Sequence, residues 1–292
     1  MRRIAKRVAL AVAAVVLVLA LVVGVRVFNY FRVNGQKLND KLHVFSGGGG
    51  NSAVLVTGAG CVVVDTKMWI GATRLRDAIE PFGKVRAIVN THHHLDHTHG
   101  NPLFPAGTDV YAAAPVTELL QRFDHDFWQK EPAKQLMPNH PFQGRVDVDL
   151  GEETLRLVQL PASHTGGGDI AVLFVKARVV HTGDVVVNGL YPRIDAESGG
   201  STRGAIAATD AILELPFDTV IPGHGPVGTR DDVVRMRAYY VALVDHARAA
   251  RGKGLSVSEA EKTAPDVLRG RESMTGFTSL KRNLEVAMAE LP

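Results

Sequence analysis

The chain of 292 residues contains a single cysteine, Cys61. One cysteine cannot form an intrachain disulfide, so a covalent cross-link within the chain is excluded as a source of stability. Cys61 begins the apolar run of residues 61–64, and we interpret it as a small core residue of a buried strand rather than a ligand or nucleophile. Any metal site is therefore expected to use imidazole and carboxylate groups.

The chain also lacks an excess of basic residues outside its N-terminal tail. Residues 1–41 carry a net charge of +7, whereas the whole chain carries +3, so residues 42–292 are acidic overall, with a net charge of −4. The positive charge of the chain thus belongs to its N-terminal tail. We expect no nucleic-acid partner, because charge gives no indication of one outside this tail.

Residues 8–25 form an unbroken apolar run of eighteen residues, preceded by four basic residues and followed by Arg26. As a helix this run would extend about 27 Å, close to the hydrocarbon thickness of a bilayer. No small-x-small cleavage site follows it, so we favour a single-pass anchor in the inner membrane with the rest of the chain on the extracytoplasmic side. A cleaved signal peptide, which would leave a secreted protein, is the alternative.

Beyond this run, short apolar segments indicate strands and amphipathic segments indicate helices. We expect hairpins over residues 53–66, 146–160 and 170–181, and helices over residues 69–80, 115–123, 202–215, 231–251 and, as a pair, 256–289. Hairpins flanked by helices favour two sheets covered by helices over a doubly wound parallel sheet. We expect three parts: an anchor and linker (1–35), a catalytic domain (36–252) and a C-terminal helical extension (253–292).

Two segments match neither the helix period nor the strand period. Residues 34–40 are interpreted as a short linker. Residues 124–145 have the length of a lid or substrate wall, with a surface insertion as the alternative.

Five of the twelve histidines fall within residues 91–99, directly after the apolar run of residues 85–89. Crowded imidazoles repel one another when charged, and a divalent metal explains their concentration. His92 and His94 are two residues apart, so on an extended backbone both point the same way, whereas His93 points the opposite way. Asp96 and His97 follow and would face a second metal position.

Three further candidate ligands follow apolar runs in the same way: His164, Asp184 and His224. Loops at strand ends converge on a rigid sheet, so we expect these side chains to meet the histidine cluster. His164 would complete a three-histidine site, His224 would complete the second position, and Asp184 would bridge the two metals. Such donors suit zinc, and also iron or manganese.

Seven candidate ligands therefore occur in the order and spacing of a known family: His92, His94, Asp96, His97, His164, Asp184 and His224. This set resembles the metallo-β-lactamase superfamily of binuclear metallohydrolases, over about residues 42–250. The resemblance implies an α+β fold, a four-layer αββα sandwich with the site at one edge, and two zinc ions. An aspartate at position 184 is similar to the glyoxalase-II- and lactonase-like branch rather than to dedicated β-lactamases.

The resemblance implies a hydrolase in which a hydroxide between two zinc ions attacks an ester, thioester, lactone or amide bond of a small molecule. Asp96 would orient that hydroxide and carry a proton to the leaving group. Two alternatives stay open: an iron-dependent, persulfide dioxygenase-like oxygenase, and an anchored metal-binding protein without catalysis. We expect the loops over residues 47–51, 124–145 and 185–203 to determine the substrate.

Overall fold

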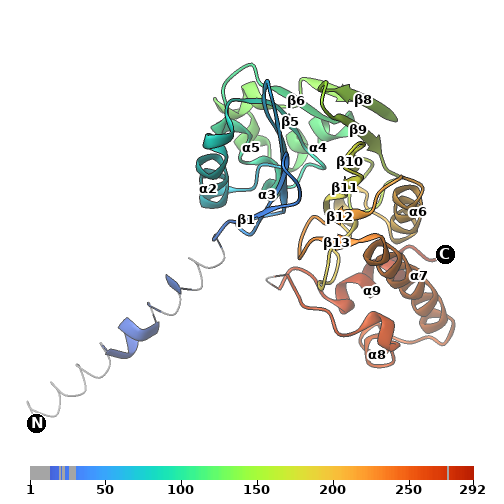
Figure 1. Cartoon of the computed structure of the whole chain (residues 1–292). Helices are drawn as coiled ribbons and strands as arrows, with labels where there is room; N and C mark the ends of the chain where they lie inside the picture. The colour runs from blue at the N-terminus through green and yellow to red at the C-terminus, as the bar shows by residue number, and fades with distance from the viewer. Residues whose placement is uncertain (1–13, 20, 22–23, 26–30, 275) are drawn as a thin grey trace, which may run out of the picture.

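The computed structural model describes residues 14–19, 21, 24–25, 31–274 and 276–292 of the chain (Figure 1). Much of the predicted anchor at residues 8–25 lies outside these described residues. Within them, no helix combines the length and the apolar character needed to cross a membrane. The anchor and the location of the protein therefore stay predictions.

Two β-sheets form the centre of the molecule. Among the described residues, the first sheet has seven strands in chain order: β1 (Asn34–Lys37), β2 (Leu42–Ser46), β3 (Ser52–Thr57), β4 (Gly60–Val64), β5 (Val85–Val89), β6 (Asp109–Ala113) and β7 (His140–Phe142). Neighbours are antiparallel from β1 to β4 and parallel from β4 to β7.

The second sheet has, among the described residues, six strands in the order β13-β12-β11-β10-β9-β8. Their bounds are β8 (Arg145–Asp149), β9 (Thr154–Gln159), β10 (Ile170–Phe174), β11 (Val179–His181), β12 (Thr219–Ile221) and β13 (Gly228–Thr229). All neighbours are antiparallel except β11 and β12, which are parallel.

Helices cover the outer faces of both sheets (Figure 1). The described α-helices are α2 (Trp69–Ile79), α3 (Leu95–Thr98), α4 (Pro115–Phe123), α5 (His125–Trp128), α6 (Thr202–Leu213), α7 (Arg230–Gly252), α8 (Val257–Lys262) and α9 (Leu280–Ala289). The 3₁₀ turns are η1 (Glu80–Phe82), η2 (Asn101–Leu103), η3 (Ala133–Leu136), η4 (Gly183–Val185), η5 (Ala196–Ser198) and η6 (Asp266–Leu268). The predicted helix pair over residues 256–289 corresponds to α8 and α9.

Strand alternation builds three apolar interfaces, because successive side chains point to opposite faces of a sheet. In β4, Val62 and Val64 face the second sheet, whereas Cys61 and Val63 pack toward α2. In β10, Val172 points between the sheets while its neighbours contact the core under α6 and α7. Three interfaces separate four layers, so the predicted αββα sandwich is confirmed.

Two predictions about local structure are wrong. Residues 34–40 are not a linker along their whole length, because β1 pairs antiparallel with β2. All four β1 residues are exposed, which left no alternating pattern to detect. Residues 124–145 are not a structureless wall of the site: they form α5, η3 and β7, and both Trp128 and Leu136 are fully buried.

Candidate metal centre

Every candidate ligand lies just past the end of a strand. The loop after β5 carries His92 and His94, and the short helix α3 carries Asp96 and His97. The second sheet supplies the remaining three, which follow β9, β11 and β12: His164, Asp184 and His224. Rigid strands thus fix the starting points of all the loops that meet here.

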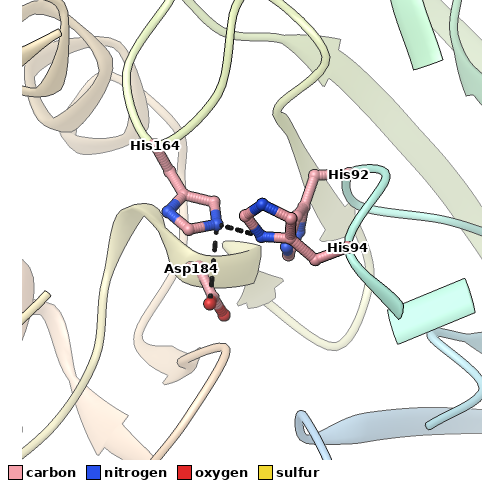
Figure 2. Close-up of side chains that lie close together, drawn as sticks. All are labelled: His92, His94, His164 and Asp184. Atoms are coloured by element: carbon pink, nitrogen blue, oxygen red, sulfur yellow. Dashed lines mark hydrogen bonds and ion pairs between the residues drawn. The ribbon is translucent and has the colours of Figure 1, made fainter. Parts of the chain in front are cut away.

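The first group of donors consists of His92, His94, His164 and Asp184, whose candidate ligand atoms all lie within 4.8 Å of one another (Figure 2). His94 Nδ1 lies 2.9 Å from His164 Nε2, and His164 Nε2 lies 3.6 Å from Asp184 Oδ2. Figure 2 shows the rings of His94 and His164 next to each other, with the carboxylate of Asp184 below them. Three imidazoles with one carboxylate are a donor set that zinc accepts.

The second group consists of Asp96, His97 and His224, whose ligand atoms also lie within 4.8 Å of one another. His224 Nε2 is 3.2 Å from Asp96 Oδ2. Asp184 faces this group too, with Oδ1 3.2 Å from His97 Nε2 and Oδ2 3.5 Å from His224 Nε2. All seven predicted residues therefore come together in two groups with Asp184 between them, and their binding of metal stays a prediction.

The two nitrogens of each imidazole have different surroundings. The outward nitrogen of four rings has a protein partner: His92 Nδ1 lies 3.0 Å from Thr91 Oγ1, His94 Nε2 2.8 Å from Asp195 Oδ2, His97 Nδ1 2.6 Å from Asp65 Oδ2, and His164 Nδ1 2.7 Å from the Arg193 carbonyl oxygen. Several inward atoms are buried without a hydrogen-bond partner among the described residues: Nε2 of His92, His97 and His224, and Oδ1 of Asp184.

These inward atoms test whether the residues fit metal ions. His97 Nε2 and Asp184 Oδ1 lie 3.2 Å from each other, and His224 Nε2 lies 3.2 Å from Asp96 Oδ2, at ion-pair distance but without a hydrogen bond. Leaving a buried polar atom without a hydrogen bond costs about 1–3 kcal/mol. A cation at each group would give every one of the inward atoms a partner. The outward hydrogen bonds meanwhile fix each ring and its tautomer, as expected for histidines that ligate a metal.

Asp65 is a residue of this site that sequence reasoning missed. It is fully buried just after β4, and its Oδ2 accepts hydrogen bonds from His97 Nδ1 and, at 2.7 Å, from Thr91 Oγ1. Thr91 Oγ1 in turn accepts from His92 Nδ1. One carboxylate thus orients a histidine in each group, His97 directly and His92 through Thr91. Its φ of +60° is a signal of functional constraint that the sequence does not contain.

Two other charged residues near the site were also missed. Asp195 lies 2.8 Å from His94 Nε2 and orients that ring from the far side of the first group. Lys67 is fully buried, and its Nζ donates to the carbonyl oxygens of Phe45 at 2.8 Å and Gly50 at 2.6 Å. Burial lowers the pKa of Lys67 to about 7, although Asp65 opposes this effect. Lys67 therefore holds the glycine loop after β2, residues 47–50, in place beside the metal centre.

Glycines allow the backbone to approach the ligands closely. A Cβ on Gly50 would lie 2.3 Å from the ring of His97, and a Cβ on Gly223 would lie 2.0 Å from Asp184 Oδ1. The amide of Gly50 also donates to the Asp96 carbonyl oxygen at 3.0 Å. The run of four glycines before residue 51 therefore lets the backbone approach the ligands closely.

Charge coupling within the second group changes its protonation. Burial alone would lower the pKa of His97 and of His224. For His97, the carboxylates of Asp65, Asp184 and Asp96 outweigh this effect and raise the pKa. For His224, Asp184 and Asp96 raise the pKa to about 9. The neighbouring carboxylates therefore favour protonation of both rings, so metal binding here would compete with protons.

The remaining histidines near the site have other surroundings. His93 is buried, its ring centroid lies 5.6 Å from that of Phe123, and burial lowers its pKa to about 3. His99 pairs with Asp124 and stacks on Phe127. His181 Nε2 donates to the Asn51 carbonyl oxygen at 3.0 Å, and its Nδ1 accepts from the amide of Gly183 at 3.1 Å. His181 thus supports the turn that carries Asp184.

A cavity of about 380 Å³ opens over the two groups. Asp96, Asp184 and His224 form its polar side, together with His94 and Arg193. The rest of its lining is glycine and apolar side chains: Gly47, Gly48, Gly49, Met68, Leu95, Met274 and Phe277. Two of the three loops expected to determine the substrate contribute to it, and residues 124–145 do not line it.

Comparison with known families supports the same assignment. The family model described as the metallo-beta-lactamase superfamily matches residues 46–224, more than half of the chain. The chain belongs to the metallo-beta-lactamase superfamily. The matched residues include all seven candidate ligands, and they end before α7 and the C-terminal helices.

One curated relative is the 2,4-dinitroanisole O-demethylase subunit alpha of Nocardioides sp. (strain JS1661). It is 28% identical over an alignment of 171 residues that covers 56% of this chain and 49% of that protein. Among solved structures, the stereoselective inverting sec-alkylsulfatase Pisa1 from Pseudomonas sp. has a TM-score of 0.66 at 17% identity, covering 88% of this chain and 50% of that one. The chain spans about half the length of these two proteins.

A metallo-beta-lactamase from Pontibacter korlensis has a TM-score of 0.62 at 16% identity, covering 72% of this chain and 99% of that one. At such identities these structures show the metallo-beta-lactamase fold alone. The assignment to the glyoxalase-II- and lactonase-like branch of the superfamily stays a prediction.

Proposed function

We propose that this chain is a binuclear metal-dependent hydrolase that cleaves an ester, thioester, lactone or amide bond of a small molecule. The observation that carries the proposal is the set of buried inward atoms: Nε2 of His92, His97 and His224 and Oδ1 of Asp184. Membership of the metallo-beta-lactamase superfamily supports it as well.

The first metal would be held by His92, His94 and His164, and the second by Asp96, His97 and His224. Asp184 would serve both, because its Oδ2 lies 3.6 Å from His164 Nε2 of the first group and 3.5 Å from His224 Nε2 of the second. We propose zinc at both positions, since imidazole and carboxylate donors without a thiolate suit it, with iron and manganese as the metals to exclude.

Two cations held by these residues would lower the pKa of a coordinated water and polarise the bond to be cleaved. The protein residues supply positioning and proton transfer. Asp96 has 24% of its side chain exposed, whereas His97 is fully buried, so Asp96 is the carboxylate of the second group that substrate and water reach. We assign it the role of accepting a proton and passing it to the leaving group.

We expect the loops around the site, rather than the fold, to determine which substrate is cleaved. The names of the curated relative and of the Pisa1 structure refer to different substrates, an aryl methyl ether and a sec-alkyl sulfate. A screen must therefore include these two bond types beside acyl compounds.

A hydrolysis screen of the zinc-loaded protein tests the proposal. We expect turnover of at least one class among 4-nitrophenyl esters, thioesters, lactones and β-lactams, with loss of activity after chelation and recovery on adding zinc. Sec-alkyl sulfates and aryl methyl ethers serve as the comparison arms. Turnover that survives complete metal removal, or no turnover of any class by fully loaded protein, would contradict the proposal.

A further inference from the structure

The stretch between η6 and α9, residues 269–279, lies outside the part of the chain matched by the family model. We call it the C-terminal strap, and all of it except residue 275 is described. In Figure 1 it extends from α8 toward the side of the molecule where β1 lies, and then turns back to α9.

The strap is fixed to the loop that follows η4. The amide of Glu272 donates to the Gly189 carbonyl oxygen at 2.9 Å, and the Glu272 carbonyl oxygen accepts from the amide of Tyr191 at 2.9 Å. Arg271 lies over the ring of Tyr239 in α7, 4.6 Å from its centroid. These contacts hold the first half of the strap against the catalytic body.

The second half of the strap forms a turn with internal support. The amide of Met274 donates to Thr278 Oγ1 at 2.8 Å, and the amide of Phe277 donates to the Met274 carbonyl oxygen at 2.9 Å. Thr278 is buried, and Arg282 Nη1 donates to the Phe277 carbonyl oxygen at 3.0 Å. The turn therefore presents Met274 and Phe277 in defined positions.

Both residues line the cavity over the metal centre, as do Met68 and Leu95. Phe277 is 63% exposed and Leu95 is 41% exposed, so two apolar side chains of the cavity wall face solvent. Exposed apolar side chains that line a concave site are typical of ligand contact. A bound apolar group would remove both from water.

Arg193 also lines this cavity and would favour an anionic substrate group. Its guanidinium, however, lies 3.3 Å from Asp195 Oδ2, and that carboxylate offsets part of its charge. The apolar walls are therefore the dominant recognition feature of the cavity.

We propose that Met274 and Phe277 of the C-terminal strap determine specificity, and that they select a substrate with an apolar alkyl or aryl body. The apolar body would lie between the strap and the pair formed by Met68 and Leu95, with the scissile bond directed at Asp96 and Asp184. This inference rests on the proposed hydrolase function and specifies its substrate class.

The test uses 4-nitrophenyl acetate, butyrate and hexanoate with the full zinc-loaded chain. Each fully buried methylene contributes roughly a fourfold gain, so kcat/KM is expected to rise at least about tenfold from acetate to hexanoate. In the Met274→Ser/Phe277→Ser double variant the rise with chain length is expected to disappear, whereas Val267→Ser is expected to retain it. Val267→Ser is the matched control, because Val267 is 45% exposed on the same extension and does not line the cavity.

A second measurement separates this inference from the proposed function. The free carboxylates acetate and hexanoate are titrated into the zinc-loaded proteins, and their binding is measured by calorimetry. Tighter binding of hexanoate that is lost only in the double variant, without hydrolysis of any compound class in the screen, supports the inference and contradicts the function. Hydrolysis without chain-length dependence, or a dependence that the double variant retains, overturns the inference and leaves the function standing.

Discussion

An Asp96→Asn variant is expected to lose about a thousandfold in kcat/KM for the best substrate of the zinc-loaded protein. Asp96 Oδ2 lies 3.2 Å from His224 Nε2, and the carboxylate is partly exposed to the cavity. Asparagine keeps the size of the side chain but neither accepts a proton nor supplies a negative ligand. The measurement is steady-state kinetics together with the zinc content of the variant.

Asp124→Asn is the matched control for this variant. Asp124 pairs with His99 of the same histidine-rich stretch, yet it belongs to neither donor group. We expect its kcat/KM to stay within a few-fold of the wild type. Full activity of Asp96→Asn on every hydrolysed substrate would refute the role given to Asp96.

Replacement of Asp65 is expected to have the second largest effect. Asp65→Ala leaves the amide and hydroxyl of Thr91 and the Nδ1 of His97 without their acceptor inside the protein. We expect the free energy of unfolding to fall by about 2–4 kcal/mol. Zinc affinity should fall about 10–100-fold, because the ring of His97 loses the group that orients it. Denaturant unfolding and competitive zinc titration measure the two effects.

The Asp65→Asn variant separates the role of Asp65 in orienting the ring of His97 from its role in packing. Its amide oxygen is able to accept from Thr91, but its NH₂ group would face His97 Nδ1 and favour the tautomer with the proton on Nε2, which cannot ligate a metal. We expect a smaller loss of stability with a similar loss of zinc affinity. Glu153→Ala is the control, because Glu153 is a buried carboxylate that accepts backbone hydrogen bonds at the opposite end of β9. It should lower stability and leave zinc affinity unchanged.

The strands and the order of the ligands were predictable from the sequence for a local reason. Strand alternation and the turns that follow it depend on neighbouring residues, so the run before His92 and the run before His224 are both recognisable without tertiary contacts. The same locality placed His92 and His94 on one side of an extended backbone. The cavity-facing glycines before Asn51 were also visible as a run, although their contact with His97 was not.

Residues that support the ligands were not predictable, because their contacts join distant parts of the chain. Asp65 and His97 are 32 residues apart, and His94 and Asp195 are 101 apart. Asp65 and Asp195 are each one carboxylate among the 30 acidic residues of the chain, and neither belongs to a motif. Lys67 resembles any polar loop residue in sequence, and only its burial reveals that it fastens the glycine loop.

The part of the cavity wall that the C-terminal strap forms was not predicted from the sequence, for the same reason. Met274 and Phe277 lie about fifty residues after His224, beyond the segment in which the candidate ligands occur. Their position depends on the pairing of Glu272 with the loop after η4, a contact that no local pattern indicates. Conversely, residues 124–145 were interpreted as a lid or substrate wall because they show neither the helix nor the strand period. In the structure, Trp128 and Leu136 of this segment are buried in the core.

The metal content of the chain tests the central claim most directly. The purified protein, loaded with excess zinc and dialysed against metal-free buffer, is analysed by inductively coupled plasma mass spectrometry beside Asp96→Asn. We expect two equivalents of zinc per wild-type chain and about one for the variant, because His92, His94 and His164 still form the first site. One equivalent of iron without zinc in the protein as purified, or no more than one equivalent of any metal in the loaded wild type, would contradict the central claim.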